Sequence, residues 1–207
     1  MAVLAMASLT LNSCKKDPFW SEDMQKKAAD TIRGEYEIES LVWEGPEVDM
    51  DGDSLATKEL LKEWSALRLS GAQKGRISVP NPPVVMDDEP VMNTIDIYIP
   101  FQKMFYLEEY DEYDYRGGTL QYKTTFIINR KGELLLDYNP FTKDEVFKFE
   151  DTKRNGDDFK VFQPEYAKLQ VKIASYTVYD RLAQKFVSAP VTLLYKRVKY
   201  ETENPYL

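Results

Sequence analysis

The chain of 207 residues contains no histidine and a single cysteine, Cys14. Without histidine it lacks the commonest general base, the Ser-His-Asp and Cys-His catalytic arrangements, and the usual protein ligand of zinc and copper. A single cysteine cannot form a disulfide within the chain. Any catalysis would have to use carboxylates, lysines, tyrosines or a hard metal ion bound by oxygen. We therefore expect a protein that is not an enzyme.

Basic residues are in the minority, with 27 Lys and Arg against 35 Asp and Glu and a formal net charge of −8 at pH 7. Nucleic-acid binding needs a basic surface, because the ligand is a polyanion. We therefore expect no nucleic-acid partner. The length suits one domain of ordinary size with a real hydrophobic core.

The chain opens with an apolar stretch without charge, residues 2–11, that ends just before Asn12, Ser13 and Cys14. The stretch is too short for the ~20 residues that span a bilayer as a helix, but it has the length of the apolar part of a secretory signal. Leu11, Ser13 and Cys14 match the lipobox of bacterial lipoproteins, and the opening resembles such a signal.

This resemblance implies cleavage before Cys14 and attachment of several acyl chains to that residue, which then has no free thiol. The membrane would be bound through lipidated Cys14, and the location would be the bacterial cell envelope, as an outer-membrane lipoprotein facing the periplasm or the cell exterior. The predicted organisation is a signal peptide over 1–13, a tether over 14–30 and a single domain over 31–207.

Two short helices are expected. The first covers residues 21–32, with Ser21 as N-cap and two acidic residues in the first turn. The second covers residues 54–70, where Leu60, Leu61, Trp64 and Leu67 fall at helical spacing.

Most of the remaining chain has the alternating pattern of half-buried strands. In the first strand, Tyr36, Ile38 and Val42 are expected on one face. The clearest hairpin joins residues 119–128 and 133–138 through a turn that ends in Gly132. Further strands are expected in this order: 94–99, 146–149, 159–162, 167–179 and 191–199. The inward residues that would line the core or a cavity are Ile95, Ile97, Phe126, Leu134, Leu136 and Ile173.

Eight or nine strands joined by short turns predict a mainly β fold, an antiparallel up-and-down meander with one or two short helices. The meander either closes into a barrel or folds into a β-sandwich.

Three features together resemble the lipocalin-like lipoproteins of Bacteroidetes, an uncharacterised family. They are the lipobox, a short helix that runs into Gly34-Glu35-Tyr36, and an Asp-rich segment, residues 49–53, followed by Leu60-Leu61-Lys62-Glu63. The resemblance implies a lipocalin-like barrel whose interior is either packed or hollow.

Asp49, Asp51 and Asp53 stand at alternate positions, where carboxylates can converge on a hard cation such as Ca²⁺. The segment departs from the EF-hand pattern at its glycine and glutamate positions, so a looser oxygen site that includes Glu59 is the metal hypothesis. The alternative, which we favour, is an aspartate-rich turn in which Asp53 or Ser54 caps the next helix.

Residues 105–115 are rich in aromatic and acidic side chains, and Tyr110, Tyr113 and Tyr115 are the candidate ligand-binding residues. Aromatic rings beside carboxylates suit a sugar or a cationic ligand. The alternative, which we favour, is a solvated loop or strand edge whose tyrosines pack one face against the barrel.

The leading functional hypothesis is a lipid-anchored, non-enzymatic β-barrel of the cell envelope that binds a small ligand or a protein partner. The second is a carbohydrate-binding accessory or a carboxylate-dependent glycan-processing protein. It would need exposed aromatic residues and two facing carboxylates.

Overall fold

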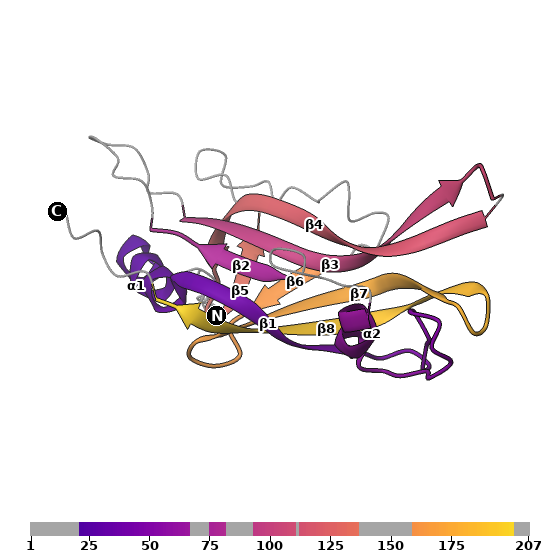
Figure 1. Ribbon diagram of the computed structural model, residues 1–207. Coiled ribbons are helices and arrows are strands. Elements are labelled where there is room, and N and C mark those ends of the chain that lie inside the picture. Colours follow the sequence, from indigo (N-terminus) through magenta and orange to yellow (C-terminus); the bar gives the residue numbers. More distant parts are fainter. Residues whose placement is uncertain (1–20, 67–74, 82–92, 111, 137–158, 201–207) are drawn as a thin grey trace, which may run out of the picture.

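The computed structural model describes residues 21–66, 75–81, 93–110, 112–136 and 159–200. Eight antiparallel strands form a closed barrel in chain order, because each strand pairs with the next and the last pairs back with the first (Figure 1). The strands are β1 (Gly34–Trp43), β2 (Arg76–Val79), β3 (Asn93–Leu107), β4 (Glu112–Ile128), β5 (Glu133–Leu136), β6 (Phe159–Phe162), β7 (Lys168–Asp180) and β8 (Lys185–Lys199). The predicted up-and-down barrel is confirmed, and the β-sandwich alternative is wrong. Cys14 and the predicted strand 146–149 lie outside the described residues.

The predicted hairpin between β4 and β5 has the expected turn. Gly132 has φ +77°, a conformation that costs glycine little. Asn129 holds the turn from the other side, because its Oδ1 accepts hydrogen bonds from the N–H groups of Lys131 (2.9 Å) and Glu133 (3.1 Å). An asparagine that bonds to the backbone two residues ahead and a glycine with positive φ are what this turn requires.

Helix α1 (Glu22–Ile32) packs against one end of the barrel. Ala29 and Ile32 are fully buried there. The Gln25 amide bonds both backbone groups of Ile128, donating from Nε2 to the carbonyl (2.7 Å) and accepting its N–H at Oε1 (2.9 Å). The predicted boundary between tether and domain, after residue 30, therefore falls inside a helix that packs on the barrel from Gln25 onward.

Helix α2 (Leu60–Ala66) begins six residues later than the sequence indicated. The residues before it form a tight loop, in which Gly52 and Ser54 both have positive φ. That loop is stabilised by a buried carboxylate, described below, which the helical periodicity alone does not reveal.

The barrel interior is crossed by side chains from one wall to the other. The hydroxyl of Tyr176 on β7 donates to the carbonyl of Pro100 on β3 (2.6 Å), and β3 and β7 stand four strands apart in the eight-stranded ring. Tyr195 on β8 donates to the carbonyl of Tyr98 on β3 (3.1 Å). The barrel is therefore filled, not hollow, at the level of these two tyrosines.

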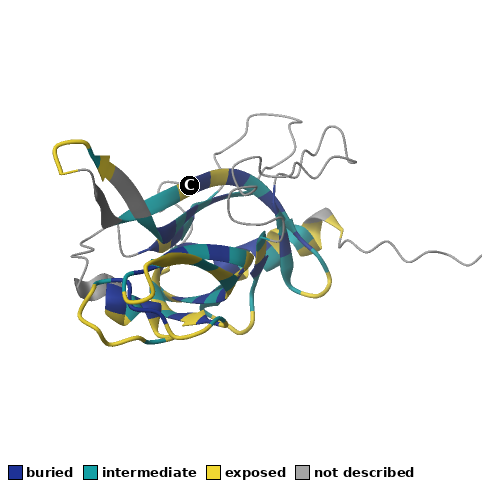
Figure 2. Cartoon of the chain, turned by 90° about the vertical axis from the view of Figure 1, so that its right-hand side faces the viewer, coloured by how far each residue is buried: buried dark blue, intermediate teal, exposed yellow. Residues whose placement is uncertain are grey.

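The rest of the core is apolar. The residues predicted to face inward are all buried: Ile95, Ile97, Phe126, Leu134, Leu136 and Ile173. Buried positions alternate with less buried ones along most strands (Figure 2). No helix in the described part of the chain is long and apolar enough to cross a membrane.

The predicted inner face of β1 is correct at its start and wrong at its end. Tyr36 is buried, but Val42 is 53% exposed, and its neighbours Leu41 and Trp43 are buried instead. The pairing of β1 with β8 shifts register between Ile38 and Ser40. A β-bulge adds one residue and so exchanges the inward and outward faces of the strand that follows it.

The two ends of the barrel differ. Helix α1 lies at one end, and at the other the β3–β4 hairpin diverges from the β7–β8 hairpin (Figure 1). The hairpin separates after Gln102, whose amide still bonds the backbone of Tyr179 on β7, accepting its N–H at Oε1 (2.5 Å). Beyond that point β3 and β4 pair only with each other among the described residues. We call residues 103–116 the arm.

Candidate functional site

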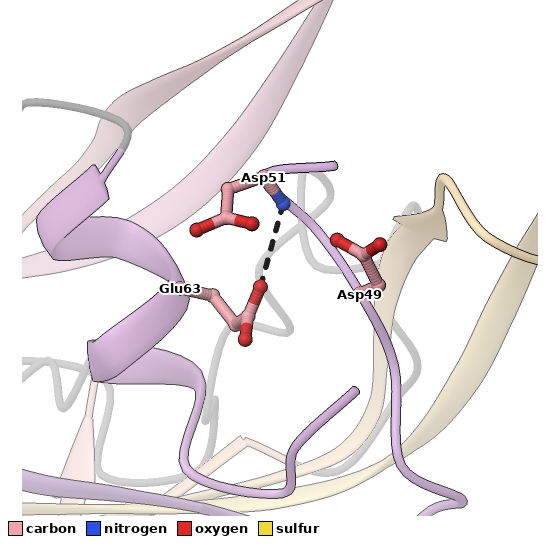
Figure 3. Close-up of side chains that lie close together, drawn as sticks. All are labelled: Asp49, Asp51 and Glu63. Atoms are coloured by element: carbon pink, nitrogen blue, oxygen red, sulfur yellow. Dashed lines mark hydrogen bonds between the residues drawn. The ribbon is translucent and has the colours of Figure 1, made fainter. Parts of the chain in front are cut away.

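Three carboxyl groups meet beside the loop that joins β1 to α2 (Figure 3). This loop lies at the same end of the barrel as the arm (Figure 1). Asp49 and Asp51 come from the loop and Glu63 from α2, and one oxygen of each lies within 4.8 Å of the others. Asp49 is 1% exposed and Glu63 is 4% exposed. We call residues 49–54 together with Glu63 the acidic loop.

The two buried carboxylates of this loop are engaged by backbone N–H groups. Asp49 accepts from Gly52 at Oδ1 (2.6 Å) and from Ser54 at Oδ2 (2.9 Å). Glu63 accepts from Met50 (3.0 Å) and from Asp51 (3.4 Å) at the same oxygen, Oε2. Buried carboxylates persist when hydrogen bonds replace their lost hydration, and these bonds also hold the backbone in its tight turn.

Burial raises the pKa of Glu63 above its usual value. The hydrogen bond from the Met50 N–H lowers the pKa and so opposes this shift, while the neighbouring charges of Asp51 and Asp49 raise it further. The net direction is upward, so Glu63 holds a proton more tightly in the folded chain than in the unfolded one.

The acidic loop is tied to the turn between β7 and β8. The carbonyl of Asp49 accepts the N–H of Arg181 (2.7 Å), and the carbonyl of Asp51 accepts from the Arg181 guanidinium (3.4 Å). Asp180, which is buried, accepts the N–H of Ala183 at Oδ1 (3.1 Å). The Arg181 guanidinium therefore already lies beside the backbone of the acidic loop.

The set of carboxylates that lie together differs from the set in the sequence-based metal hypothesis. Asp49 and Asp51 lie together, but Asp53 is exposed and accepts the N–H of Leu55 (2.7 Å). Glu59, the suggested additional ligand, forms an ion pair with Lys62 (2.6 Å). Glu63 takes the third place in the group.

Sequence reasoning missed Glu63, although a signal was present. It follows Leu60 by three residues, so the helical period places it on the buried stripe of α2. An acidic residue on an apolar stripe marks a carboxylate that must find partners inside the protein. Ca²⁺ at this loop stays a prediction, and a bound ion would compete with the N–H groups that now occupy the carboxylates.

The second predicted site, the tyrosine-rich segment, is the arm. Tyr110 at its tip is 65% exposed and Tyr106 is 50% exposed. The tip is a turn closed by the Tyr110 N–H, which donates to the carbonyl of Leu107 (3.1 Å). Tyr113 and Tyr115 belong to β4, where the register sets them opposite Tyr106 and Met104 respectively. The expectation that these tyrosines pack against the barrel is not met at Tyr110.

No known protein family, curated protein or solved structure matches the chain. The fold and its two candidate sites therefore define the class of protein, a closed eight-stranded up-and-down β-barrel with a projecting hairpin.

Proposed function

We propose that this protein is a lipid-anchored, non-enzymatic β-barrel of the bacterial cell envelope that binds a partner through its arm. The anchor rests on the sequence alone, on the match of Leu11, Ser13 and Cys14 to a lipobox. The absence of histidine supports the non-enzymatic part. The arm supports the binding part.

The observation that carries the proposal is the position of the arm relative to α1. The first residue of α1, Glu22, lies eight positions after Cys14, a stretch that reaches at most about 28 Å when fully extended. A lipid on Cys14 would thus keep the α1 end of the barrel close to the membrane. The arm lies at the other end, where a partner outside the bilayer has access to it (Figure 1).

The filled barrel supports a partner on the surface over a cargo inside. Tyr176 and Tyr195 cross the interior between opposite walls, and both are almost fully buried. A ligand at this level would have to displace two aromatic rings and break two hydrogen bonds, one buried and one partly buried, each costing about 1 kcal/mol.

The anchor is tested by mass spectrometry of the full protein extracted from membranes. We expect a chain that begins at Cys14 and carries the mass of several acyl chains. The variant Cys14→Ala should leave the detergent phase. Continued partitioning of that variant with detergent would contradict the anchor.

The role of the arm is tested by photocrosslinking in cells with a light-activated amino acid at Tyr110 or, as a control, at Met24 on α1. Both positions are exposed in the structure. We expect a crosslinked product from position 110 and not from position 24. Equal products from both positions, or none from 110, would contradict binding through the arm.

The carbohydrate hypothesis has one observation in its favour, because Tyr110 is exposed beside Glu108 and Glu109. A ring free to stack and carboxylates free to accept hydrogen bonds are what a glycan needs. A glycan array distinguishes it, since a sugar-binding arm would give a signal that Tyr110→Ala abolishes.

A further inference from the structure

An unusual patch of positive charge lies on the outer surface of β6, β7 and β8. Lys160 on β6 stands directly opposite Lys172 on β7, and Lys168 on β7 stands directly opposite Lys196 on β8. Like charges in such positions destabilise a sheet by a few tenths of a kcal/mol or more. A chain with a net charge of −8 nevertheless places two such pairs on one face, four residues apart along β7, although Lys196 also stands opposite Glu37 of β1. We call these four residues the lysine face.

Part of this charge is compensated within the chain and part is not. Lys168 forms ion pairs with Glu165 (2.8 Å) and Glu39 (3.5 Å). Lys160 and Lys172 are exposed, and neither forms an ion pair with any residue that the structure describes. Within the described part of the chain, no carboxylate therefore competes with an external anion for this pair.

Between the two lysine pairs the surface is partly apolar. Phe162 on β6, Gln170 on β7 and Leu194 on β8 form one row across the three strands, and all three are half-buried. Lys172 lies over the ring of Phe162, with 5.9 Å between its Nζ and the ring centroid. The lysine face thus offers positive charges around a strip that an aromatic ring can cover.

The arm has the opposite character. Its tip presents Glu108 and Glu109 beside Tyr106 and Tyr110, and all four are exposed. The sequence from residue 107 to 115 contains five acidic residues and no basic one. Negative charges next to exposed rings complement the lysine face in both charge and polarity.

We propose that the arm of one molecule docks on the lysine face of a second copy of this chain. The inference rests on the proposed role of the arm and names its partner. The arm cannot reach the lysine face of its own barrel, because β7 runs seven residues from Lys172 to Tyr179, where the arm departs. At about 3.3 Å per residue this is about 23 Å, and the arm then leads further away. Arm and face are different surfaces, so the contact is heterologous and joins molecules head to tail.

The test uses the full chain carrying Cys14→Ser, so that lipid does not drive association, and measures its mass by sedimentation velocity. We expect oligomers at low salt that grow with protein concentration and dissociate at high salt, because the attraction is between exposed charges. The arm variant Glu108→Lys/Glu109→Lys and the face variant Lys160→Glu/Lys172→Glu should each be monomeric. The control variant Lys26→Glu/Lys27→Glu changes two exposed lysines on α1 by the same charge and should associate like the original.

Mixing the two monomeric variants gives the sharpest result. The face variant keeps an intact arm and the arm variant keeps an intact face, and the two reversed surfaces also complement each other. The mixture should therefore associate into oligomers in which the two variants alternate. A chain that carries all four substitutions should associate again, with the charges exchanged. A monomeric original chain, or a mixture that does not pair, overturns the proposal. If the original chain is monomeric while position 110 still crosslinks to a different protein, self-association falls and the proposed role of the arm stands.

Discussion

At the scale of single residues, the acidic loop shows how a buried charge is retained. Asp49 and Glu63 give up their hydration, and backbone N–H groups of the loop replace it. Each carboxylate therefore fixes the turn that buries it. The same arrangement provides the oxygen atoms that suggested a metal site, which explains why an Asp-rich sequence is ambiguous between a cation ligand and a turn.

The raised pKa of Glu63 predicts a pH dependence of stability. Because the folded chain binds this proton more tightly than the unfolded chain, the contribution of Glu63 to stability is largest below its ordinary pKa of 4.5 and falls as the pH rises above it. Glu63→Gln keeps an oxygen that can accept the Met50 N–H but cannot ionise. We expect the unfolding free energy of Glu63→Gln, relative to the original, to increase from pH 4 toward pH 7 in urea titrations.

Glu47→Gln, an exposed acidic residue of the same connection between β1 and α2, is the matched control and should show no such trend. If the difference in unfolding free energy between Glu63→Gln and the original does not change with pH, burial does not raise the pKa of Glu63. Repeating the titration with millimolar CaCl₂ tests the metal hypothesis. A bound cation would stabilise the ionised form of Glu63 and remove the decline.

At the scale of elements, α1 is attached to the barrel at its C-terminal end by one arginine of β8. The Arg197 guanidinium donates to the carbonyls of Thr31 (2.9 Å) and Arg33 (3.2 Å). It also lies 4.7 Å from the ring centroids of both Tyr166 and Tyr200. A positive charge at the C-terminus of a helix satisfies its free carbonyls and interacts favourably with the helix dipole.

Arg197→Ala should therefore weaken the attachment of the C-terminal end of α1. We expect a loss of about 2 kcal/mol of unfolding free energy, from two hydrogen bonds to a charged donor and from the stacking on the tyrosines. Arg197→Lys should recover only part of it, since an ammonium group cannot reproduce the planar fork. Denaturation in urea measures the loss, and hydrogen exchange of the α1 amides locates it. Lys196→Ala, an exposed neighbour, should change stability by no more than about 0.5 kcal/mol.

Most of the elements could be predicted from the sequence, for reasons visible in particular residues. Alternating Ile95, Ile97 and Ile99 define a strand with one buried face, and all three are buried. The reversal of faces at Val42 could not be predicted, because the β-bulge that causes it depends on how β1 pairs with β8, a strand about 150 residues away in the sequence. The late start of α2 escaped prediction for a similar reason, since the buried environment of Asp49 decides where its loop ends.

At the scale of the whole molecule, the pairing of β1 with β8 closes the barrel, and side chains inside it link strands that are not neighbours. The Tyr176 hydroxyl has no access to water, because the side chain is buried in the apolar core. Burial also raises its pKa well above the usual value. Its bond to the Pro100 carbonyl is therefore a specific link between β7 and β3.

Tyr176→Phe removes that hydrogen bond and keeps the aromatic ring. We expect a loss of about 1–2 kcal/mol of unfolding free energy, the cost of leaving a buried carbonyl without its donor. Urea denaturation provides the measurement, and Tyr110→Phe on the exposed arm is the control that should leave stability unchanged. If Tyr176→Phe has the same unfolding free energy as the original chain, the contact between β7 and β3 does not contribute to stability.

Charge is also distributed unevenly over the whole molecule. This distribution is the basis of the proposed association between the arm of one copy and the lysine face of another. The arm carries acidic residues at one end, and the lysine face carries four lysines on the side of the barrel. Because the net charge is strongly negative, attraction between these two surfaces must outweigh a general repulsion between molecules. We expect their association to weaken steeply as salt is added, as the sedimentation experiment measures.

The sequence by itself determined the class of fold, since the alternation of apolar residues and the glycine of the β4–β5 turn are local properties of the chain. It also shows that histidine is absent and that the opening of the chain resembles a lipobox. Only the tertiary structure decided that Glu63 joins Asp49 and Asp51, that Tyr176 fills the barrel, and that lysines from three strands gather on one face. These features depend on which distant segments become neighbours, and the closing of the barrel sets those neighbours through pairings that no short stretch of sequence contains.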